Sequence, residues 1–383
     1  MDSWGRFKMI SVLCLRYYPA LGGVETRVLE VTSRLSKSFQ LKVITSDLKM
    51  EMPYQRLTKE ECLTKYRDVP ITRLESKKFL PVEGYGVKLK GLEVAIQDSD
   101  MIHTHTYGAH HTDKAIKIAN KLNIPSILTT HLHPASHSHH KILRTLYDSI
   151  IGKKTLHRCT SIITMTEIEK EYIASRFRIS KEKMITIPSG IDLKKFRDLG
   201  YEREKHTILF VGRLSPVKRL DMLLRAVASV KKKVPNVKLR IIGKDWGVKN
   251  HLVELASRLN IKDNVEFMGE ITFENLIEQY NRVKAFVLTS KYEALGVTIM
   301  EAIGCETPVV VTRVGGTPEV VSNAGILCHE NEESVAKGII EVLTNEEKYD
   351  KLRENTKTRR KGFDWDDIAK KVKSVYKKTL EEK

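Results

Sequence analysis

The sequence predicts an α/β protein made of two Rossmann-like halves. Short runs rich in β-branched residues alternate with longer stretches of helical period, a pattern typical of parallel sheets covered by helices on both faces. The alternation starts again past the middle of the chain, and 383 residues suffice for two domains of roughly 100–200 residues each. We therefore expect domains at 1–195 and 196–362, with a C-terminal helix at 363–383 that crosses back to the first domain.

In the first half we expect strands at residues 7–15, 41–45, 101–104, 126–130, 161–165 and 184–187. In the second half we expect them at 207–211, 238–242, 265–268, 285–289 and 308–312. Apolar residues recur at helical spacing from Leu220 to Val234, which predicts an amphipathic helix. The polar stretch 192–205 shows no strand pattern and is the expected hinge between the halves.

The chain is strongly basic, with 66 Lys and Arg against 48 Asp and Glu and a net charge of +18. Such a charge attracts polyanions and anionic surfaces. The five cysteines are odd in number and include no CxxC pair, so we expect reduced thiols in a reducing compartment. No apolar run approaches the roughly 20 residues that span a bilayer. We therefore expect a cytoplasmic protein without a signal peptide, at most peripheral on the cytoplasmic face of a membrane.

Two loops that follow predicted strands carry groups suited to phosphate, and open α/β sheets bind their ligands beyond the carboxyl ends of strands. Gly22 and Gly23 open a helix, where paired glycines let backbone N–H groups approach an anion. An ordinary tight turn is the alternative there. Arg213 and Lys218 follow a strand of the second half, and a guanidinium with a compact ammonium can hold a diphosphate. A solvated basic helix start is the alternative for that pair.

The run from Glu293 to Glu301 places two carboxylates eight positions apart around a helix start. Glu293 precedes the helix. Glu301 lies inside it, about one turn from the N-terminus, where free N–H groups and the helix dipole favour a bound anion. The remainder of that helix is apolar, so a merely solvated Glu301 is the weaker interpretation. A further pair, Gly315 and Gly316, opens a helix with ordinary start signals.

Histidines crowd into the first half, between His103 and His140. No nearby cysteine or regularly spaced carboxylate completes a zinc ligand set, so we predict no metal site. The Asp-x-Asp patterns at Asp98 and Asp364 fall at the wrong edge of a sheet and at a helix start, and we do not take them as metal ligands. His131 ends a strand at the carboxyl edge of its sheet, where we expect it to contact a bound ligand. A loop or helix-capping histidine is the alternative.

These loops resemble the family-4 glycosyltransferases (GT4), retaining enzymes of the GT-B fold, whose two Rossmann-like domains face each other across a cleft. The motifs that carry the resemblance are GGVE, IHTH, PSGIDLKKF, VGRLSPVK, EALGVTIMEAIGCETPVV and TRVGGTPEV. They span nearly the whole chain in the family's order, and the paired-glutamate run is the most specific. Arg219 stands where the family usually has Gly, and Ser189 stands where it usually has Asn. Neither departure removes an expected ligand.

The resemblance implies a hexosyltransferase and assigns a role to each candidate residue. Its donor contacts would be made by Gly22, Gly23, Arg213, Lys218, Leu295, Gly296, Val297 and Glu301. Within that set, Arg213 and Lys218 would bind the diphosphate, and Glu301 would accept the ribose hydroxyls. Glu293 would face the transferred sugar and His131 would contact it near the reacting centre, so these two are the catalytic candidates.

The resemblance also implies the partners. The second domain would bind the donor, a UDP- or GDP-sugar, and the first domain would bind a lipid-linked or glycan acceptor, as in lipopolysaccharide or glycolipid biosynthesis. No cofactor and no metal ion would be needed. The charge of the basic, histidine-rich segment 131–158 separately predicts contact with the acceptor or with the anionic headgroups of a membrane. A plain solvated surface is the alternative there.

Two other interpretations remain open at the level of sequence. A nucleic-acid-binding protein would account for the +18 charge, but neither a stripe of stacking aromatic residues nor a recognition helix accompanies it, so we expect no nucleic acid. A GT-B-fold nucleotide-sugar epimerase or phosphorylase is the nearer alternative. For a phosphorylase the sequence offers no evident pyridoxal phosphate lysine or second phosphate site.

Overall fold

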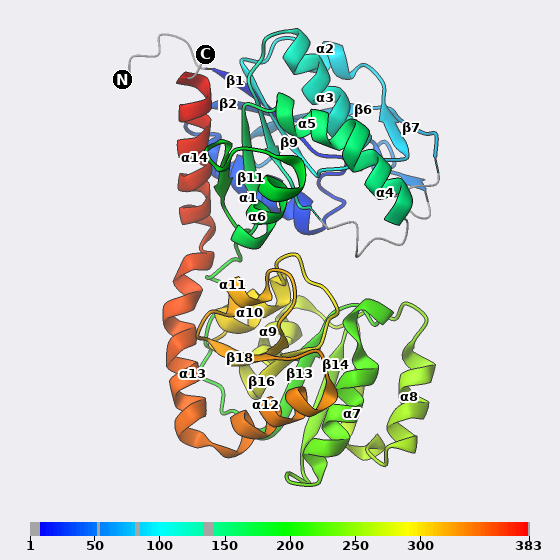
Figure 1. Ribbon diagram of the computed structural model, residues 1–383, viewed down its shortest axis with the longest axis vertical. Helices are drawn as coiled ribbons and strands as arrows, with labels where there is room; N and C mark the ends of the chain where they lie inside the picture. Colours follow the sequence, from blue (N-terminus) through cyan, green and yellow to red (C-terminus); the bar gives the residue numbers. More distant parts are fainter. Residues whose placement is uncertain (1–7, 52–53, 81–84, 133–140, 382–383) are drawn as a thin grey trace. The chain divides into compact units, whose positions relative to one another are not determined.

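The computed structural model describes residues 8–51, 54–80, 85–132 and 141–381 (Figure 1). The chain forms two compact units. The N-terminal unit comprises Met1–Ser189 and Trp365–Lys383, and the C-terminal unit comprises Gly190–Asp364. Each unit is an α/β domain with a central, mainly parallel sheet, which confirms the predicted pair of Rossmann-like domains. No helix in the described ranges combines the length and the apolar character needed to cross a membrane.

The sheet of the N-terminal unit has the strand order β12-β11-β10-β9-β1-β2-β6-β5, with parallel pairing except between β5 and β6. These strands are β1 (Met9–Leu13), β2 (Gln40–Ser46), β5 (Lys65–Tyr66), β6 (Val69–Leu74), β9 (Met101–His105), β10 (Ser126–Thr129), β11 (Ser161–Thr164) and β12 (Met184–Thr186). Its helices are α1 (Gly23–Leu35), α2 (Leu92–Ile96), α3 (His110–Lys121), α4 (Lys141–Tyr147), a π-helical turn (Asp148–Gly152), α5 (Lys153–Arg158), α6 (Glu167–Phe177) and a 3-10 turn (Lys181–Lys183). The order of strands reverses between β1 and β9, and ligands of such sheets bind at this switch point.

Two short hairpins in the N-terminal unit were not predicted. β3 (Leu48–Met50) pairs with β4 (Gln55–Arg56), and β7 (Ser76–Lys78) pairs with β8 (Val87–Leu89), both antiparallel. β5 and β6 were also missed. Most of these strands are only two or three residues long and largely exposed, so they lack the apolar run that marks a buried parallel strand.

The C-terminal unit has a six-stranded parallel sheet in the order β15-β14-β13-β16-β17-β18. The strands are β13 (Glu204–Val211), β14 (Lys238–Ile242), β15 (Val265–Gly269), β16 (Val283–Leu288), β17 (Val309–Thr312) and β18 (Gly325–Cys328). The helices are α7 (Leu220–Lys231), α8 (Lys249–Arg258), α9 (Phe273–Arg282), α10 (Val297–Gly304), α11 (Thr317–Val321), α12 (Glu332–Thr344) and α13 (Glu346–Arg359), with 3-10 turns at Pro216–Lys218, Lys262–Asn264 and Arg360–Phe363. This is the Rossmann order, and its switch point lies between β13 and β16.

The division between the units falls after Ser189, six residues before the position expected from sequence. The reason is that the start of the expected hinge is already part of the C-terminal unit. Ile191 donates its N–H to the Phe363 carbonyl at 2.9 Å, and Phe196 packs edge-on against Tyr280. β13 also begins at Glu204, inside the stretch expected to lack a strand.

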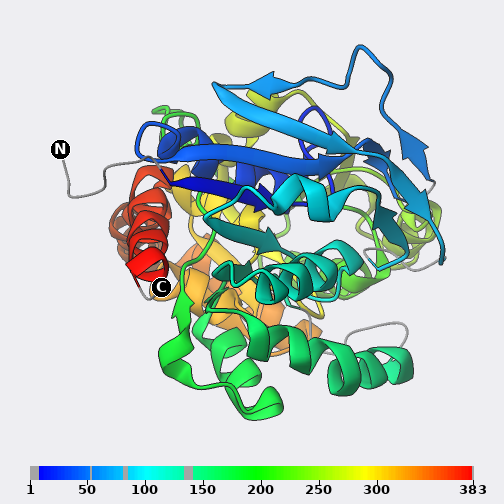
Figure 2. The same cartoon turned by 90° about the horizontal axis from the view of Figure 1, so that it is seen from above.

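The last helix, α14 (Trp365–Glu381), belongs to the N-terminal unit. It packs against α1, and its apolar face joins the core through Trp365, Ile368, Val372 and Tyr376. The second view shows α14 in red, nearly end-on, at the margin of this unit (Figure 2). A phenol–imidazole contact adds to the packing, because Tyr376 Oη lies 2.7 Å from His103 Nδ1 on β9.

Candidate functional site

The loops after β13 and β16 lie side by side in the C-terminal unit because their strands are neighbours at the switch point. Lys218 ends the 3-10 turn that follows β13, and its Nζ donates to Glu293 Oε1 at 2.5 Å. Ser290 Oγ donates to the same carboxylate oxygen at 2.6 Å. The side chains of Lys218 and Glu293 are only 16% and 13% exposed, so this ion pair is partly shielded from water and is stronger than a surface pair. The structure thus brings together two residues that the sequence marked separately.

Two hydrogen bonds to backbone carbonyls join the two loops. Thr289 Oγ1 donates to the Lys218 carbonyl at 3.0 Å, and the Lys291 N–H donates to the Val217 carbonyl at 2.8 Å. These bonds hold the two strand ends at a fixed distance. The Lys218 ammonium and the Glu293 carboxylate are therefore held at a fixed distance from each other as well. Lys218 is therefore positioned by the framework as well as by its ionic partner.

The glycine pair of the fourth loop serves the same framework. Gly315 has a φ of +48°, and a Cβ built on it would lie 2.0 Å from the Glu293 carbonyl oxygen. The next N–H, that of Gly316, donates to this same carbonyl at 2.9 Å. Only glycine permits such an approach, so the pair holds the backbone of Glu293 in place.

Arg213 has an exposed side chain whose guanidinium carbon lies 4.4 Å from the centroid of the Trp246 ring. Trp246 itself is 57% exposed and donates its backbone N–H to the Leu214 carbonyl at 3.0 Å. The indole face attracts the cation and limits where the guanidinium can lie. Trp246 was not predicted. The one signal for it in the sequence is its position four residues after the end of β14.

Glu301 is the fifth residue of α10, and Tyr280 Oη on α9 donates to its Oε2 at 2.8 Å. Burial raises the pKa of Glu301 to about 7, and the Tyr280 hydrogen bond opposes that rise. Burial also raises the pKa of Tyr280 well above its usual value, so this phenol stays a donor at neutral pH. Tyr280 is a partner of Glu301 that sequence reasoning missed.

The start of α10 offers backbone donors close to Glu293. Gly296 is the N-cap with a φ of +83°, Val297 is the first helical residue, and Leu295 before them is buried. The first N–H groups of a helix have no acceptor within it. A Cβ on Gly296 would lie 2.7 Å from Ile299 Cδ1, which explains the glycine at this position.

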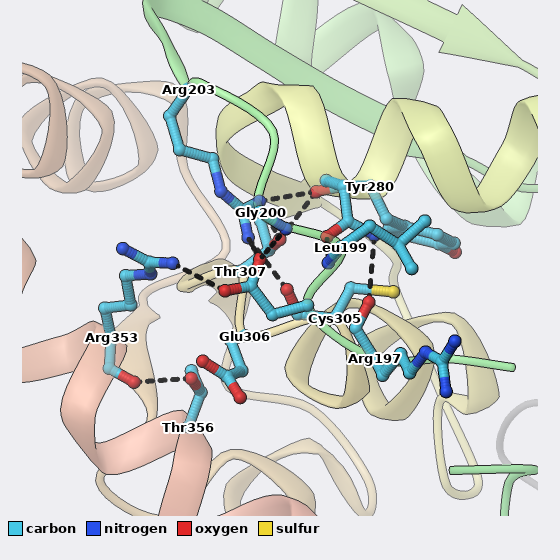
Figure 3. Close-up of polar contacts among 12 residues, drawn as sticks. Arg197, Leu199, Gly200, Arg203, Tyr280, Cys305, Glu306, Thr307, Arg353 and Thr356 are labelled. Atoms are coloured by element: carbon cyan, nitrogen blue, oxygen red, sulfur yellow. Dashed lines mark hydrogen bonds and ion pairs between the residues drawn. The ribbon is translucent and has the colours of Figure 1, made fainter. Parts of the chain in front are cut away.

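A cluster of polar contacts lies behind Tyr280 and ties α9 to the end of α10 (Figure 3). Arg203 Nη1 donates to the Tyr280 carbonyl at 2.8 Å and to Thr307 Oγ1 at 2.6 Å, and its Nη2 donates to the Cys305 carbonyl at 2.8 Å. The Arg203 side chain is 8% exposed and also pairs with Asp198. The arginine therefore fixes the backbone from which the Tyr280 phenol reaches Glu301.

At the carboxyl ends of β13, β14 and β15 the C-terminal unit has a cavity of about 210 Å³. Its lining includes Leu214, Gly243, Lys244 and Phe267. Gly243 lies so close to β13 that a Cβ on it would be 2.0 Å from the Gly212 carbonyl oxygen. The cavity is next to the Arg213 loop and has both apolar and charged walls.

Gly22 and Gly23 lie in the N-terminal unit, after β1. Gly22 is the N-cap of α1 and Gly23 is its first residue. A Cβ on Gly22 would lie 2.6 Å from Glu25 Oε2, whereas one on Gly23 would meet no atom within 4 Å beyond its chain neighbours and the backbone of its own helix. Glu25 accepts from Arg16 Nε at 3.1 Å. The space beside Gly23 is thus open, as a site approached by a ligand requires.

His131 follows β10 at the carboxyl edge of the N-terminal sheet and has a φ of +44°. Its Nε2 lies 3.3 Å from Nδ1 of His105, a buried imidazole whose pKa burial lowers well below 6.5. Glu169 holds the loop from both sides of His131, since it accepts from Thr130 Oγ1 and from the Leu132 N–H, each at 2.6 Å. Sequence reasoning missed Glu169. His131 and the glycine pair belong to one unit, and the Lys218 site belongs to the other.

Several histidines of the N-terminal unit are of a type that could bind a metal ion. His133, His137, His139 and His140 lie outside the described residues. Among the residues described, no group of three His, Cys, Asp or Glu side chains is arranged to hold a metal ion. The two Asp-x-Asp patterns have structural partners: Asp98 pairs with Lys42, and Asp366 pairs with Arg34.

Comparisons with known families cover both units. The family described as "Glycosyl transferases group 1" matches residues 192–359. The family described as "Glycosyltransferase Family 4" matches residues 21–195. Together the two matches span almost the whole chain and meet near the boundary between the units.

Individual relatives agree with the families. An uncharacterized glycosyltransferase of Methanocaldococcus jannaschii is 28% identical over 306 residues, which are 75% of this chain and 77% of the relative. The alpha-monoglucosyldiacylglycerol synthase of Streptococcus pneumoniae is 28% identical over 317 residues, 77% of this chain and 68% of the relative.

Among solved structures, HepE of Anabaena in complex with UDP and glucose superposes with a TM-score of 0.73. It is 17% identical in sequence, and the match covers 97% of this chain and 100% of HepE. The superposition shows a shared fold.

Proposed function

The chain belongs to the family-4 glycosyltransferases and has their GT-B fold, and from this membership we propose which transfer it performs. It moves a hexose from a nucleoside-diphosphate sugar to a lipid-linked or glycan acceptor, with retention of the anomeric configuration and without a metal ion. The observation that carries this proposal is the shielded Lys218–Glu293 pair at the switch point, next to the start of α10. The families that match the chain favour neither an epimerase nor a nucleic-acid-binding protein.

The chemistry needs positive charge at the leaving diphosphate. As the bond between the anomeric carbon and the diphosphate oxygen breaks, negative charge gathers on that oxygen and positive charge on the sugar ring. Lys218, Arg213 and the free N–H groups of α10 supply donors for the negative charge, so we propose that no divalent cation takes part. The Glu293 carboxylate faces the ring. The acceptor hydroxyl bonds to the same face of that carbon, and its proton passes to the departing diphosphate.

The remaining donor contacts are proposed from the family's pattern and supported by local geometry. Glu301, oriented by Tyr280, accepts the ribose hydroxyls. Leu295, Gly296 and Val297 present the backbone at the helix start. Gly23 has the open space that a phosphate needs, with Gly22 before it. In the N-terminal unit His131, at the carboxyl end of β10, contacts the transferred sugar.

The partners are proposed on what the relatives bind or make. HepE is described in complex with UDP and glucose, which favours a UDP-sugar donor over a GDP-sugar. The streptococcal relative is named as a diacylglycerol glycolipid synthase, which favours a lipid-linked acceptor. The free cysteines in the described ranges agree with action in the cytoplasm or on the cytoplasmic face of a membrane.

The test needs no known acceptor. The protein is incubated with UDP- and GDP-hexoses, release of the nucleoside diphosphate is followed, and the first sugar formed by transfer to water is identified by proton NMR before mutarotation. We expect one donor class to be cleaved, with the anomeric configuration kept and the rate unchanged by EDTA. An inverted sugar would contradict retention, and a loss of rate in EDTA would contradict the metal-free step. Faster release on addition of glycolipid vesicles than of oligosaccharide would assign the acceptor class.

A further inference from the structure

We propose that the helical segment 141–154 docks the N-terminal unit on an anionic phospholipid membrane through an exposed apolar face made of Ile142, Leu143, Leu146 and Ile150. This surface is distinct from the donor site in the C-terminal unit. We call it the apolar face.

The four side chains are far more exposed than their chemistry predicts. Ile142 is 77% exposed, Leu143 60%, Leu146 52% and Ile150 57%. They fall within nine residues, and positions three and four apart share a side of a helix. Figure 1 shows α4 at the margin of the N-terminal unit. Single exposed apolar residues are ordinary, but a contiguous group marks an interaction surface.

Three polar side chains of the same segment, Arg144, Tyr147 and Asp148, face inward and have partners there. Arg144 Nε donates to Asp148 Oδ1 at 3.1 Å, and Tyr107 Oη donates to the same oxygen at 2.9 Å. The Asp148 side chain is 3% exposed. On the preceding residue, Tyr147 Oη donates to Asp113 Oδ1 at 2.9 Å. The orientation of this segment is therefore opposite to that of the usual surface helix: its apolar side faces outward, whereas that of a surface helix normally faces the core.

Packing prevents the helix from rolling to hide the apolar face. The π-helical turn brings Gly152 so close to Tyr107 that a Cβ would lie 1.9 Å from the phenol oxygen. After the turn, Thr155 Oγ1 donates to Asp113 Oδ1 at 2.7 Å. The outward direction of the apolar residues is thus built into the unit.

The charges near the apolar face favour an anionic membrane as its binding partner. Exposed Lys153, Lys154 and Arg158 follow the apolar face. Asp148 is the one acid between residues 141 and 158, and it is turned inward. An apolar helix face with neighbouring lysines is the pattern that lies in the interface of anionic bilayers. A second copy of this chain, with its charge of +18, would instead bring like charges together.

The experiment measures sedimentation of the full-length protein with vesicles of phosphatidylglycerol and phosphatidylcholine in equal parts, and with vesicles of phosphatidylcholine alone. We expect binding to the first and little to the second. The double variant Ile142→Ser/Leu146→Ser should bind about tenfold or more weakly, because it removes much of the apolar area. Its matched control is Val94→Ser/Leu122→Ser, which alters residues that are 67% and 40% exposed elsewhere in the same unit.

A second pair of variants separates local charge from net charge. Lys153→Gln/Lys154→Gln should weaken binding to the anionic vesicles, whereas Lys232→Gln/Lys233→Gln, which changes the net charge equally, should not. The thermal shift by nucleoside diphosphate should be the same in all four variants, so failure of the proposed transfer and failure of membrane docking are distinguishable. Three results would overturn the proposal: no wild-type binding to anionic vesicles, equal loss in a variant and its control, or a dimer that Ile142→Ser/Leu146→Ser turns into a monomer.

Discussion

In the transfer that we propose, Lys218 is the residue on which the donor chemistry depends most. Its ammonium is a compact charge held by Glu293 at 2.5 Å and by the framework that bonds its own carbonyl to Thr289. Arg213, by contrast, is exposed and rests on Trp246. The two cations therefore differ in freedom: Lys218 is in place before the donor arrives, while Arg213 can leave the indole to reach a phosphate.

Replacing Lys218 with Ala should lower kcat/KM by about 10²–10³, because one preorganised donor to the leaving group is lost. The melting temperature should stay within a few degrees, since Ser290 still donates to Glu293. Steady-state kinetics and thermal unfolding check both expectations. Lys232→Ala, an exposed lysine after α7, is the control, and normal turnover in Lys218→Ala would falsify the diphosphate assignment.

Replacing Glu301 with Gln should stabilise the protein at pH 8 while weakening nucleotide binding. Burial raises the pKa of Glu301 to about 7, above its value of roughly 4.3 in an unfolded chain. The folded protein therefore holds a proton there that the unfolded chain has lost, and stability declines as the pH rises from about 4 through about 7. Above pH 7 the ionised, half-buried carboxylate costs about 1–3 kcal/mol that Gln avoids.

Thermal unfolding of Glu301→Gln and wild type from pH 5 to pH 8, with calorimetric titration of the nucleotide, measures both effects. The gain in melting temperature should shrink toward pH 5. A gain that does not depend on pH would mean that Glu301 does not titrate as described, and an unchanged nucleotide affinity would remove its ribose role.

Gly23→Ala tests whether the glycine is required for ligand binding and not for folding. Beyond the chain neighbours and the backbone of α1 itself, no atom lies within 4 Å of the added methyl group. Ala also favours a helix over Gly by up to about 1 kcal/mol, so stability should hold or rise. Donor affinity should fall if a phosphate approaches this backbone. Equal donor KM in Gly23→Ala and wild type would show that no ligand comes near.

The ligand-type residues of the candidate site could be marked from the sequence because cations, carboxylates and glycines stand in recognisable loops. Their partners could not. Tyr280 meets Glu301 across 21 positions and Lys218 meets Glu293 across 75, and no local pattern encodes such distances. Trp246 and Glu169 were missed for the same reason, since each acts on a residue of another loop.

At the scale of elements, the buried parallel strands were predictable because each is a short apolar run, and every strand expected from sequence is present with its ends shifted by at most three residues. β6 and β18 escaped prediction. β6 (VPITRL) contains Pro and is only partly buried, and β18 (GILC) is an edge strand of four residues. The resemblance to family 4 is confirmed, and so is the expectation of two Rossmann-like units.

Arg203 joins α9 to the end of α10, and Arg203→Met should destabilise the protein by about 3–5 kcal/mol because the Tyr280 and Cys305 carbonyls and the Thr307 hydroxyl lose a buried donor. Asp198 keeps Arg353 as its partner at 2.9 Å. Nucleotide affinity should also fall, since the Tyr280 carbonyl is one of its acceptors. Chemical denaturation and nucleotide titration measure the two losses. Arg225→Met, at an exposed position of α7, is the control. A loss of stability below about 1 kcal/mol would be that of an ordinary surface change and would contradict the role given to Arg203.

At the scale of the whole molecule, the chain is two Rossmann-like units, to which we propose different ligands. The C-terminal unit holds the shielded ion pair, the half-buried Glu301 carboxylate and a cavity at its strand ends, all suited to a nucleotide. The N-terminal unit recruits the last helix, α14, to complete its core and presents His131 together with an outward apolar face. The account's central claim is that the chain binds a nucleoside-diphosphate donor without metal.

The most direct measurement is thermal unfolding of wild type and Lys218→Ala with UDP, GDP, ADP or CMP, each with and without EDTA. A ligand at 100 times its Kd stabilises its protein by about 2.7 kcal/mol. The account predicts that one nucleoside diphosphate raises the wild-type melting temperature equally with and without EDTA, and that Lys218→Ala responds much less. No shift with any nucleoside diphosphate, or a shift that EDTA abolishes, would contradict it.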